Sequence, residues 1–123
     1  MTSQELLKRT FDFASSTGQL AAQLADTLAN RAYLTQLLRS TAALGLNYRI
    51  SQHTRSGENF EKRLQIVAEE AEQSIYFLQL LASLNQEQAG LLDSLIKEGT
   101  EIYRIAAASV NTVSKKKVQA VKN

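Results

Sequence analysis

The chain has 123 residues, which is enough for one domain with its own core, and its 44% hydrophobic content excludes a disordered protein. Cysteine is absent, which excludes a disulfide framework and a thiolate metal site. The formal net charge of +2 is too small to indicate nucleic-acid binding by itself.

The fold class predicted from composition is all-α. Proline is absent, glycine occurs five times, and residues that favour helices dominate the rest of the sequence. Apolar periodicity predicts helices over residues 4–27, 30–54, 58–84 and 86–113. Short connections make these helices an antiparallel up-down-up-down four-helix bundle over residues 1–114. Residues 115–123 form a basic C-terminal tail that either extends the last helix or is disordered.

Location follows from what the sequence lacks. No apolar run reaches the about 18 residues of a membrane span, so no membrane partner is expected. The N-terminus also lacks the basic start and apolar core of a signal peptide. We therefore expect a cytoplasmic protein.

The first predicted helix begins with capping-box spacing, since Thr2 is followed three residues later by Glu5. Its apolar stripe passes through Leu6, Phe13 and Leu20. The connection that follows offers Asp26 and Asn30 as alternative caps for the second helix. After that helix, Ser56 is the predicted cap of the third.

The second predicted helix carries two apolar stripes instead of one. Its core stripe consists of Leu34, Leu37, Leu38, Thr41, Leu44, Gly45 and Tyr48. About half a turn away lie Arg39, Ala43, Leu46 and Ile50. Two stripes favour a second burial partner, most simply another subunit. The alternative is a helix packed on two sides within one bundle. Gly45, inside the helix, indicates close approach of a neighbouring helix.

The third predicted helix repeats this pattern, with Leu64 and Leu78 in a core stripe and Phe77 in a second stripe. Leu38, Leu64, Leu78 and, in the fourth helix, Ile102 are predicted to be buried. The second stripes predict a homo-oligomer. Its interface residues are predicted to be Arg39, Leu46, Ile50 and Phe77.

Charge is distributed unevenly along the chain. Residues 27–57 carry +4 without a carboxylate, residues 115–123 carry another +4, and the remainder carries −6. Segregated positive charge can neutralise phosphates. The candidates for nucleic-acid binding are therefore Arg49, Arg55, Lys115, Lys116 and Lys117. The alternative is that the arginines pair with carboxylates of the acidic third helix. Arg39 in particular is expected in a buried salt bridge.

No enzyme is predicted, and neither is a cofactor or a metal. The only histidine, His53, is remote in sequence from Glu69 and Glu72, so the Glu-x-x-His pattern of a di-iron bundle is missing. No glycine-rich phosphate loop and no nucleophile beside a base are present. Tyr48 is the best candidate for an aromatic platform, but its position fits the core.

Several segments carry a family resemblance. Residues 36–40 read Gln-Leu-Leu-Arg-Ser, residues 44–47 read Leu-Gly-Leu-Asn, and residues 69–78 read Glu-Glu-Ala-Glu-Gln-Ser-Ile-Tyr-Phe-Leu. With Arg55, Ser56 and Phe60, these segments resemble the bacterial four helix bundle protein family, also called the ribosomal-RNA intervening-sequence proteins. The match extends over nearly the whole chain.

The resemblance implies an antiparallel four-helix bundle that assembles as a homopentamer. It also implies similarity to accessory proteins of diversity-generating retroelements, which bind nucleic acid and a reverse transcriptase. The family offers no agreed catalytic residues. We therefore expect a non-enzymatic oligomer that binds structured RNA or DNA. The alternative is a protein-interaction scaffold or accessory subunit without direct nucleic-acid binding, and a more distant one is a small-molecule or metal-binding bundle.

Overall fold

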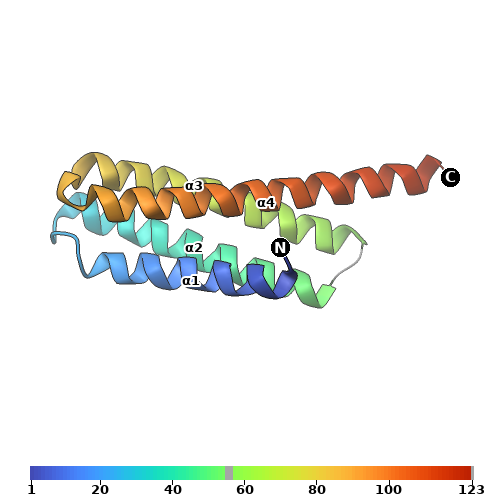
Figure 1. The fold of residues 1–123 in the computed structure, drawn as a ribbon, viewed down its shortest axis with the longest axis horizontal. Helices are drawn as coiled ribbons and strands as arrows, with labels where there is room; N and C mark the ends of the chain where they lie inside the picture. The colour runs from blue at the N-terminus through green and yellow to red at the C-terminus, as the bar shows by residue number, and fades with distance from the viewer. Residues whose placement is uncertain (55–56, 123) are drawn as a thin grey trace.

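A computed structural model describes residues 1–54 and 57–122, the last of these by its backbone alone. Its elements are α1 (Ser3–Ala21), α2 (Leu28–Thr54), α3 (Gly57–Leu84), the 3-10 turn η1 (Gln86–Gln88) and α4 (Ala89–Lys122). The helices run alternately up and down, and α2, α3 and α4 pack against their neighbours in sequence (Figure 1). This arrangement confirms the predicted all-α four-helix bundle, and the described parts of the chain contain no strand.

The start of α1 agrees with the sequence, but its end does not. Thr2 Oγ1 accepts from the Glu5 amide at 3.1 Å and the Glu5 carboxylate accepts from the Thr2 amide at 3.3 Å, which is the predicted capping box. The helix ends at Ala21, not at residue 27. Leu24 lies beyond this end and is still buried. The apolar spacing of α1 therefore extends past the end of the helix, where Leu24 is buried although its backbone is not helical.

The cap of α2 differs from both predicted candidates. Thr27 Oγ1 accepts from the Asn30 amide at 3.1 Å, so Thr27, and neither Asp26 nor Asn30, caps the helix. Asn30 has another role, because its side chain is buried against Asn85. The predicted cap of α3, Ser56, lies outside the described residues.

The last helix is longer than predicted, since α4 continues to Lys122 and not to residue 113. The basic segment is therefore helical, and it projects beyond the other three helices (Figure 1). Lysine, glutamine and alanine lose little conformational freedom in a helix, and extending an existing helix does not require a new helical turn to nucleate.

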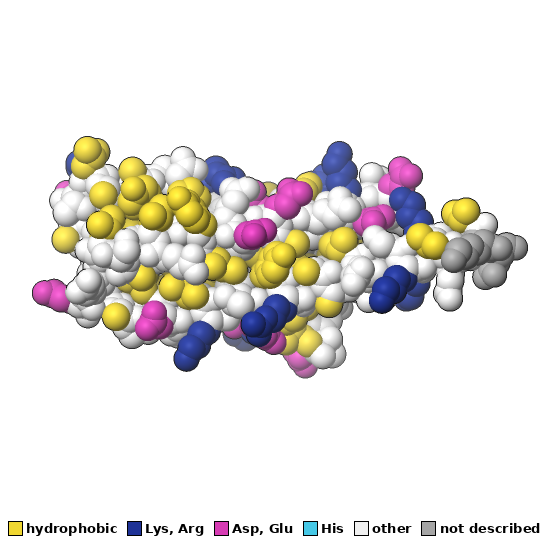
Figure 2. All heavy atoms as spheres, turned by 90° about the horizontal axis from the view of Figure 1, so that it is seen from above, with side chains coloured by type: hydrophobic (Ala, Val, Ile, Leu, Met, Phe, Trp, Pro, Cys, Tyr) yellow, Lys and Arg dark blue, Asp and Glu magenta, His cyan; other side chains and the backbone are white. Residues whose placement is uncertain are grey.

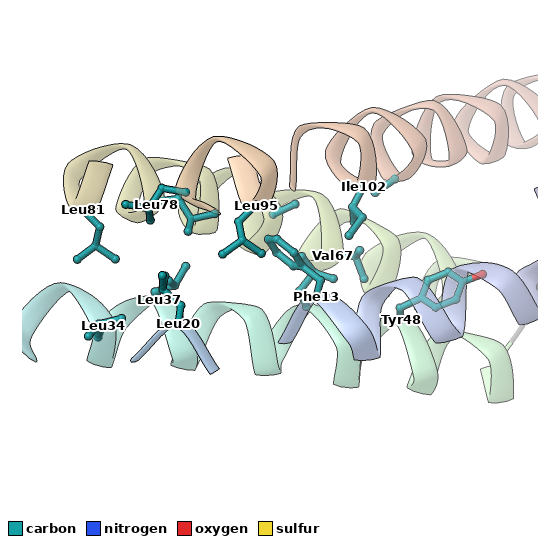
Figure 3. Packing of buried hydrophobic residues seen from close by; sticks show 14 of the residues in the cluster. Phe13, Leu20, Leu34, Leu37, Tyr48, Val67, Leu78, Leu81, Leu95 and Ile102 are labelled. Carbon is teal, nitrogen blue, oxygen red and sulfur yellow. The ribbon is translucent and has the colours of Figure 1, made fainter. Parts of the chain in front are cut away.

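The core extends along the bundle axis. Leu64, Leu78 and Ile102 are buried as predicted, and Tyr48 is also buried. Leu78 and Leu81 face α2, where Leu37 occupies the interior (Figure 3). The prediction for Leu38 is wrong because its neighbour Leu37 takes the interior position and leaves Leu38 only partly buried.

Small residues, a glycine and two serines, lie where the helices contact one another closely. A Cβ atom added at Gly45 would lie 3.4 Å from the Thr10 carbonyl oxygen of α1, which confirms the predicted close approach. Ser40 and Ser74 are joined by a 2.8 Å hydrogen bond between α2 and α3. Each hydroxyl group also lies within hydrogen-bond distance of a carbonyl of its own helix, Ser40 of Leu37 and Ser74 of Glu70, so the bond between the helices adds to their register without being the only partner of either group.

Candidate functional site

The two ends of the bundle differ in charge. At one end, α2 passes to α3 and α4 projects. We call this the open end and define it as residues 47–54, 57–65 and 112–121. It contains six lysine or arginine residues and two glutamates. The opposite, closed end (residues 22–35 and 79–94) contains one arginine and three carboxylates. The fold therefore gathers positive charge that the sequence distributes over three segments.

A cavity of about 540 Å³ at the open end joins α2, α3 and α4, with Tyr48, Phe60 and Lys116 in its wall. Gln52 lines this cavity and also lines a groove that contains Arg49. Arg49 and Lys116 thus line two hollows that share Gln52, although 67 positions separate them in the chain. The fold therefore brings two of the predicted nucleic-acid-binding segments to the same end of the bundle.

Lysines of the projecting segment differ in their contacts. Lys117 Nζ lies 3.4 Å from Glu61 Oε2 and 3.8 Å from Glu58 Oε1, so it tethers α4 to α3. Lys115 and Lys116 are exposed and form no ion pair with any other described residue. Figure 2 shows basic side chains along this projecting part of the molecule.

The tether also affects a carboxylate. The Ser114 hydroxyl donates a 2.7 Å hydrogen bond to Glu61 Oε1 and thereby lowers the pKa of this carboxyl group. The charge of Lys117 lowers the pKa further, while partial burial of Glu61 opposes both effects. Glu61 is therefore held in its ionised form, which is the form that attracts Lys117.

Arg49 is exposed on α2 and has no ion pair with another residue in the described ranges. Arg55, also predicted to bind nucleic acid, lies outside those ranges. The structure adds Lys62, which is exposed at the open end, and Arg63, which donates a 2.8 Å hydrogen bond to Asn47. Sequence reasoning missed both because they lie within a helix of net negative charge. Only the direction of α3 places them beside the other cations.

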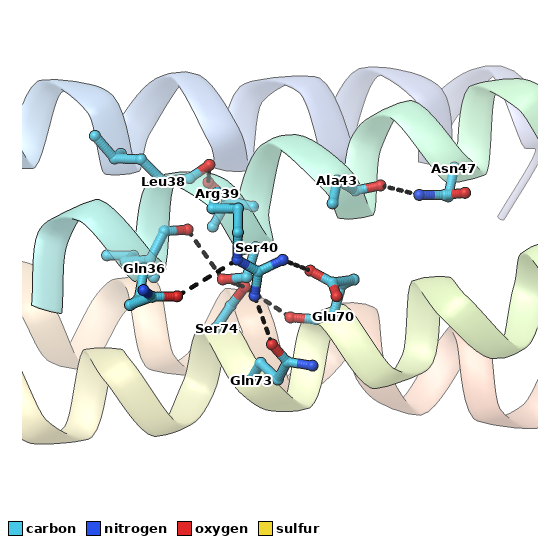
Figure 4. Close-up of polar contacts among 11 residues, drawn as sticks. Gln36, Leu38, Arg39, Ser40, Ala43, Asn47, Glu70, Gln73 and Ser74 are labelled. Atoms are coloured by element: carbon cyan, nitrogen blue, oxygen red, sulfur yellow. Dashed lines mark hydrogen bonds and ion pairs between the residues drawn. The ribbon is translucent and has the colours of Figure 1, made fainter.

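Arg39 has its partners within the same chain. Its guanidinium lies 3.2 Å from Glu70 and donates to Gln73 at 2.7 Å, both on α3 (Figure 4). The expected carboxylate partner is present, but the side chain of Arg39 remains 50% exposed, so the expectation of a buried salt bridge is wrong. The partner comes from the acidic third helix, as the alternative interpretation stated.

The other three predicted interface residues have different environments. Ile50 and Phe77 are partly buried, whereas Leu46 is 58% exposed. Leu46 forms one wall of a groove of about 560 Å³ between α1 and α2, opposite Phe11, which is 70% exposed. Ala14, Ala42 and Gly45 also line the groove, and its lining contains no carboxylate. Phe11 was not among the predicted interface residues, because only the packing of α1 on α2 places it beside Leu46.

Within residues 1–54 and 57–122, no group of three or more histidine, aspartate or glutamate side chains could hold a metal ion. The helices in these ranges also include none with the length and apolarity needed to cross a bilayer.

No family model matches the chain, and neither does any curated protein. A solved structure does match it, the crystal structure of a protein of unknown function from the S23 ribosomal protein family of Bacteroides thetaiotaomicron VPI-5482. The two sequences are 23% identical, and the match covers 90% of this chain and 99% of that chain with a TM-score of 0.77. At this identity the likeness shows a common fold, so the chain has the helical architecture of that protein.

Proposed function

We propose that this chain is the subunit of a non-enzymatic homo-oligomer that binds structured RNA or DNA at its open end. The observation that carries the proposal is the convergence of α2, α3 and α4 there. Exposed Arg49, Lys62, Lys115 and Lys116 lie at this end without ion-pair partners among the described residues. Cations left unpaired by the protein are available to phosphate oxygens.

The chemistry of this surface favours contacts to the nucleic-acid backbone. Lysine and arginine side chains recognise phosphates in any sequence. Tyr48, the predicted aromatic platform, is only 5% exposed and cannot stack on a base. Binding is therefore expected to tolerate changes of sequence and to weaken steeply with salt.

Assembly multiplies this weak surface. One subunit offers few phosphate contacts, but several copies on one nucleic acid act together through effective concentration. The resemblance to the ribosomal-RNA intervening-sequence proteins favours a pentamer and makes structured RNA the first ligand to test. The structural match to a member of the S23 ribosomal protein family supports the same choice.

A second candidate function is a protein-interaction scaffold, for instance an accessory subunit of a reverse transcriptase, without direct nucleic-acid binding. Two observations favour it. Arg39 and Lys117 already have carboxylate partners within the chain, and the exposed groove beside Leu46 is apolar. In this case the basic residues serve the structure and the assembly.

The deciding experiment is a titration of the oligomer with a labelled RNA hairpin at about 50 and 200 mM salt, where phosphate contacts lose much of their affinity. Lys115→Gln with Lys116→Gln should weaken binding at the lower salt and flatten the dependence on salt, while the oligomer stays intact. The matched control, Arg31→Gln with Lys97→Gln, removes two charges remote from the open end and should bind like the unaltered protein. Absence of binding by an intact oligomer at the lower salt, or equal losses in both variants, would favour the scaffold.

A further inference from the structure

The proposed function does not use the apolar walls of the groove between α1 and α2. Phe11 and Leu46 form these walls and are 70% and 58% exposed, while small residues lie between them. Arg49 and His53 line the groove toward the open end. A groove with apolar walls, a basic margin and no carboxylate suits an apolar ridge that carries negative charge.

An exposed aromatic side chain with carboxylates beside it lies on another face of the same molecule, where Glu69, Glu72, Gln73, Tyr76 and Phe77 line a hollow of about 430 Å³. Tyr76 on α3 is 58% exposed, and its ring meets that of Phe77 edge to face with centroids 5.5 Å apart. Glu69 and Glu72 are exposed on the same side and form no ion pair with other residues of the described ranges. We call Glu69, Glu72, Tyr76 and Phe77 the α3 ridge.

We propose that the α1–α2 groove of one copy receives the α3 ridge of a second copy. This inference rests on the oligomer in the proposed function and specifies its interface. Tyr76 would enter between Phe11 and Leu46, and the ridge carboxylates would meet Arg49 at the margin of the groove. In the assembly Arg49 then serves the interface, and Lys62, Lys115 and Lys116 remain for nucleic acid. Arg39, which the sequence placed at the interface, keeps its partners within its own chain.

The spacing of charges supports this pairing. From Tyr76, Glu72 lies four positions and Glu69 seven positions along α3 toward the open end. From Leu46, Arg49 lies three positions and His53 seven positions along α2, also toward the open end. These are steps of about one and two helical turns in both cases. Two parallel copies can therefore place Tyr76 against Leu46, a ridge carboxylate near Arg49 and a second one near the imidazole of His53 at the same time.

The heights of the two faces define the geometry further. Ser40 lies opposite Ser74 and Asn47 opposite Arg63, which places Leu46 and Tyr76 about 15 Å apart along the bundle axis. Neighbouring copies must therefore be tilted, because a shift of this distance at every contact would build an open helix and not the proposed closed pentamer. Because the groove and the ridge are different surfaces, each copy retains one of each for a further neighbour, and the assembly is head-to-tail. Parallel copies also place their lysine-bearing ends on the same side.

The test uses two variants, each of which blocks one face. Leu46→Glu places a carboxylate in the groove, and Tyr76→Glu removes the aromatic anchor of the ridge. Both positions are exposed, so the fold should persist, which far-UV circular dichroism checks. Sedimentation velocity should show that the unaltered protein is an oligomer and that each variant alone is a monomer of 13.6 kDa.

Mixing the two variants provides the decisive result. The Leu46→Glu chain keeps an intact ridge and the Tyr76→Glu chain an intact groove, so an equimolar mixture should form a heterodimer of twice the monomer mass and nothing larger. Leu84→Glu, at an exposed apolar position outside the ridge, is the matched control and should assemble like the unaltered protein.

Three outcomes would overturn the inference: a monomeric unaltered protein at micromolar concentration, normal assembly of either variant alone, or a mixture that remains monomeric. Normal assembly of the variants would reject this interface and leave the proposed function in place. Loss of hairpin binding by an oligomer with this interface would reject the nucleic-acid proposal alone.

Discussion

The closed and open ends of the bundle differ in how their polar groups are paired. At the closed end, Asn30 and Asn85 exchange side-chain hydrogen bonds of 2.9 and 2.8 Å. Each also donates to a backbone carbonyl, those of Ala25 and Leu81 respectively, so the buried amides are well satisfied. At the open end, a cavity lies between three helices, and Lys115 and Lys116 lie in solvent without an ion pair in the described chain.

If the proposed function holds, this difference separates stability from interaction within a small bundle. Buried leucines at the closed end contribute to stability because their apolar surface is removed from water. The paired amides are buried without losing hydrogen bonds, because each bonds the other. Exposed cations at the open end contribute little to stability, since water and salt screen them. Changes at the closed end should therefore alter unfolding, whereas changes at the open end should alter binding.

The largest expected effect is a loss of stability in the core next to the closed end. Leu78→Ala removes a fully buried side chain and should lower the free energy of unfolding by about 2–5 kcal/mol, because a cavity adds to the lost transfer energy. Val118→Ala, at a position 54% exposed on the projecting part of α4, should change it by less than about 0.5 kcal/mol. Urea unfolding followed by circular dichroism measures both. Similar losses in the two variants would remove the distinction between the ends.

A smaller effect is expected from the paired amides. Asn85→Ala leaves the Asn30 side chain buried without one of its partners and should cost about 1–3 kcal/mol. If the two amides act as a pair, adding Asn30→Ala should cost much less than a second independent loss. A double-mutant cycle in urea measures this coupling. Additive losses would contradict the pairing.

The smallest expected effect is a pH dependence at the open end. Ser114 and Lys117 lower the pKa of Glu61 below its ordinary value of 4.5, so ionised Glu61 adds stability at neutral pH. This increment should be lost as the pH falls below about 4.5 and the carboxylate is protonated. The urea midpoint should fall less between pH 6 and pH 3.5 in Glu61→Gln than in the unaltered protein.

The control for this pH effect is Glu69→Gln, which changes an exposed glutamate without an ion pair in the described chain. Its midpoint should follow that of the unaltered protein across the same pH range. Equal behaviour of the two variants would mean that the hydrogen bond from Ser114 does not stabilise the folded state.

Local features of the sequence predicted local features of the structure. The capping box of Thr2 and Glu5 depends on four neighbouring residues, and the structure has it. The same holds for the interior positions of Leu64, Leu78 and Ile102, because helical periodicity decides which face is apolar. Prediction was weaker at helix ends. Periodicity continues through Leu24, but it does not specify where the backbone stops being helical.

The sequence by itself determined the helical class, the core face of each helix and the uneven charge of the chain, because all three depend on residue type and spacing. Only the tertiary structure decided which distant residues meet. It joined Asn30 to Asn85, gave Arg39 a partner on α3, and brought Arg49 and Lys116 to the same end. The physical reason is that such contacts depend on the relative register and rotation of packed helices, which the fit of the whole core determines.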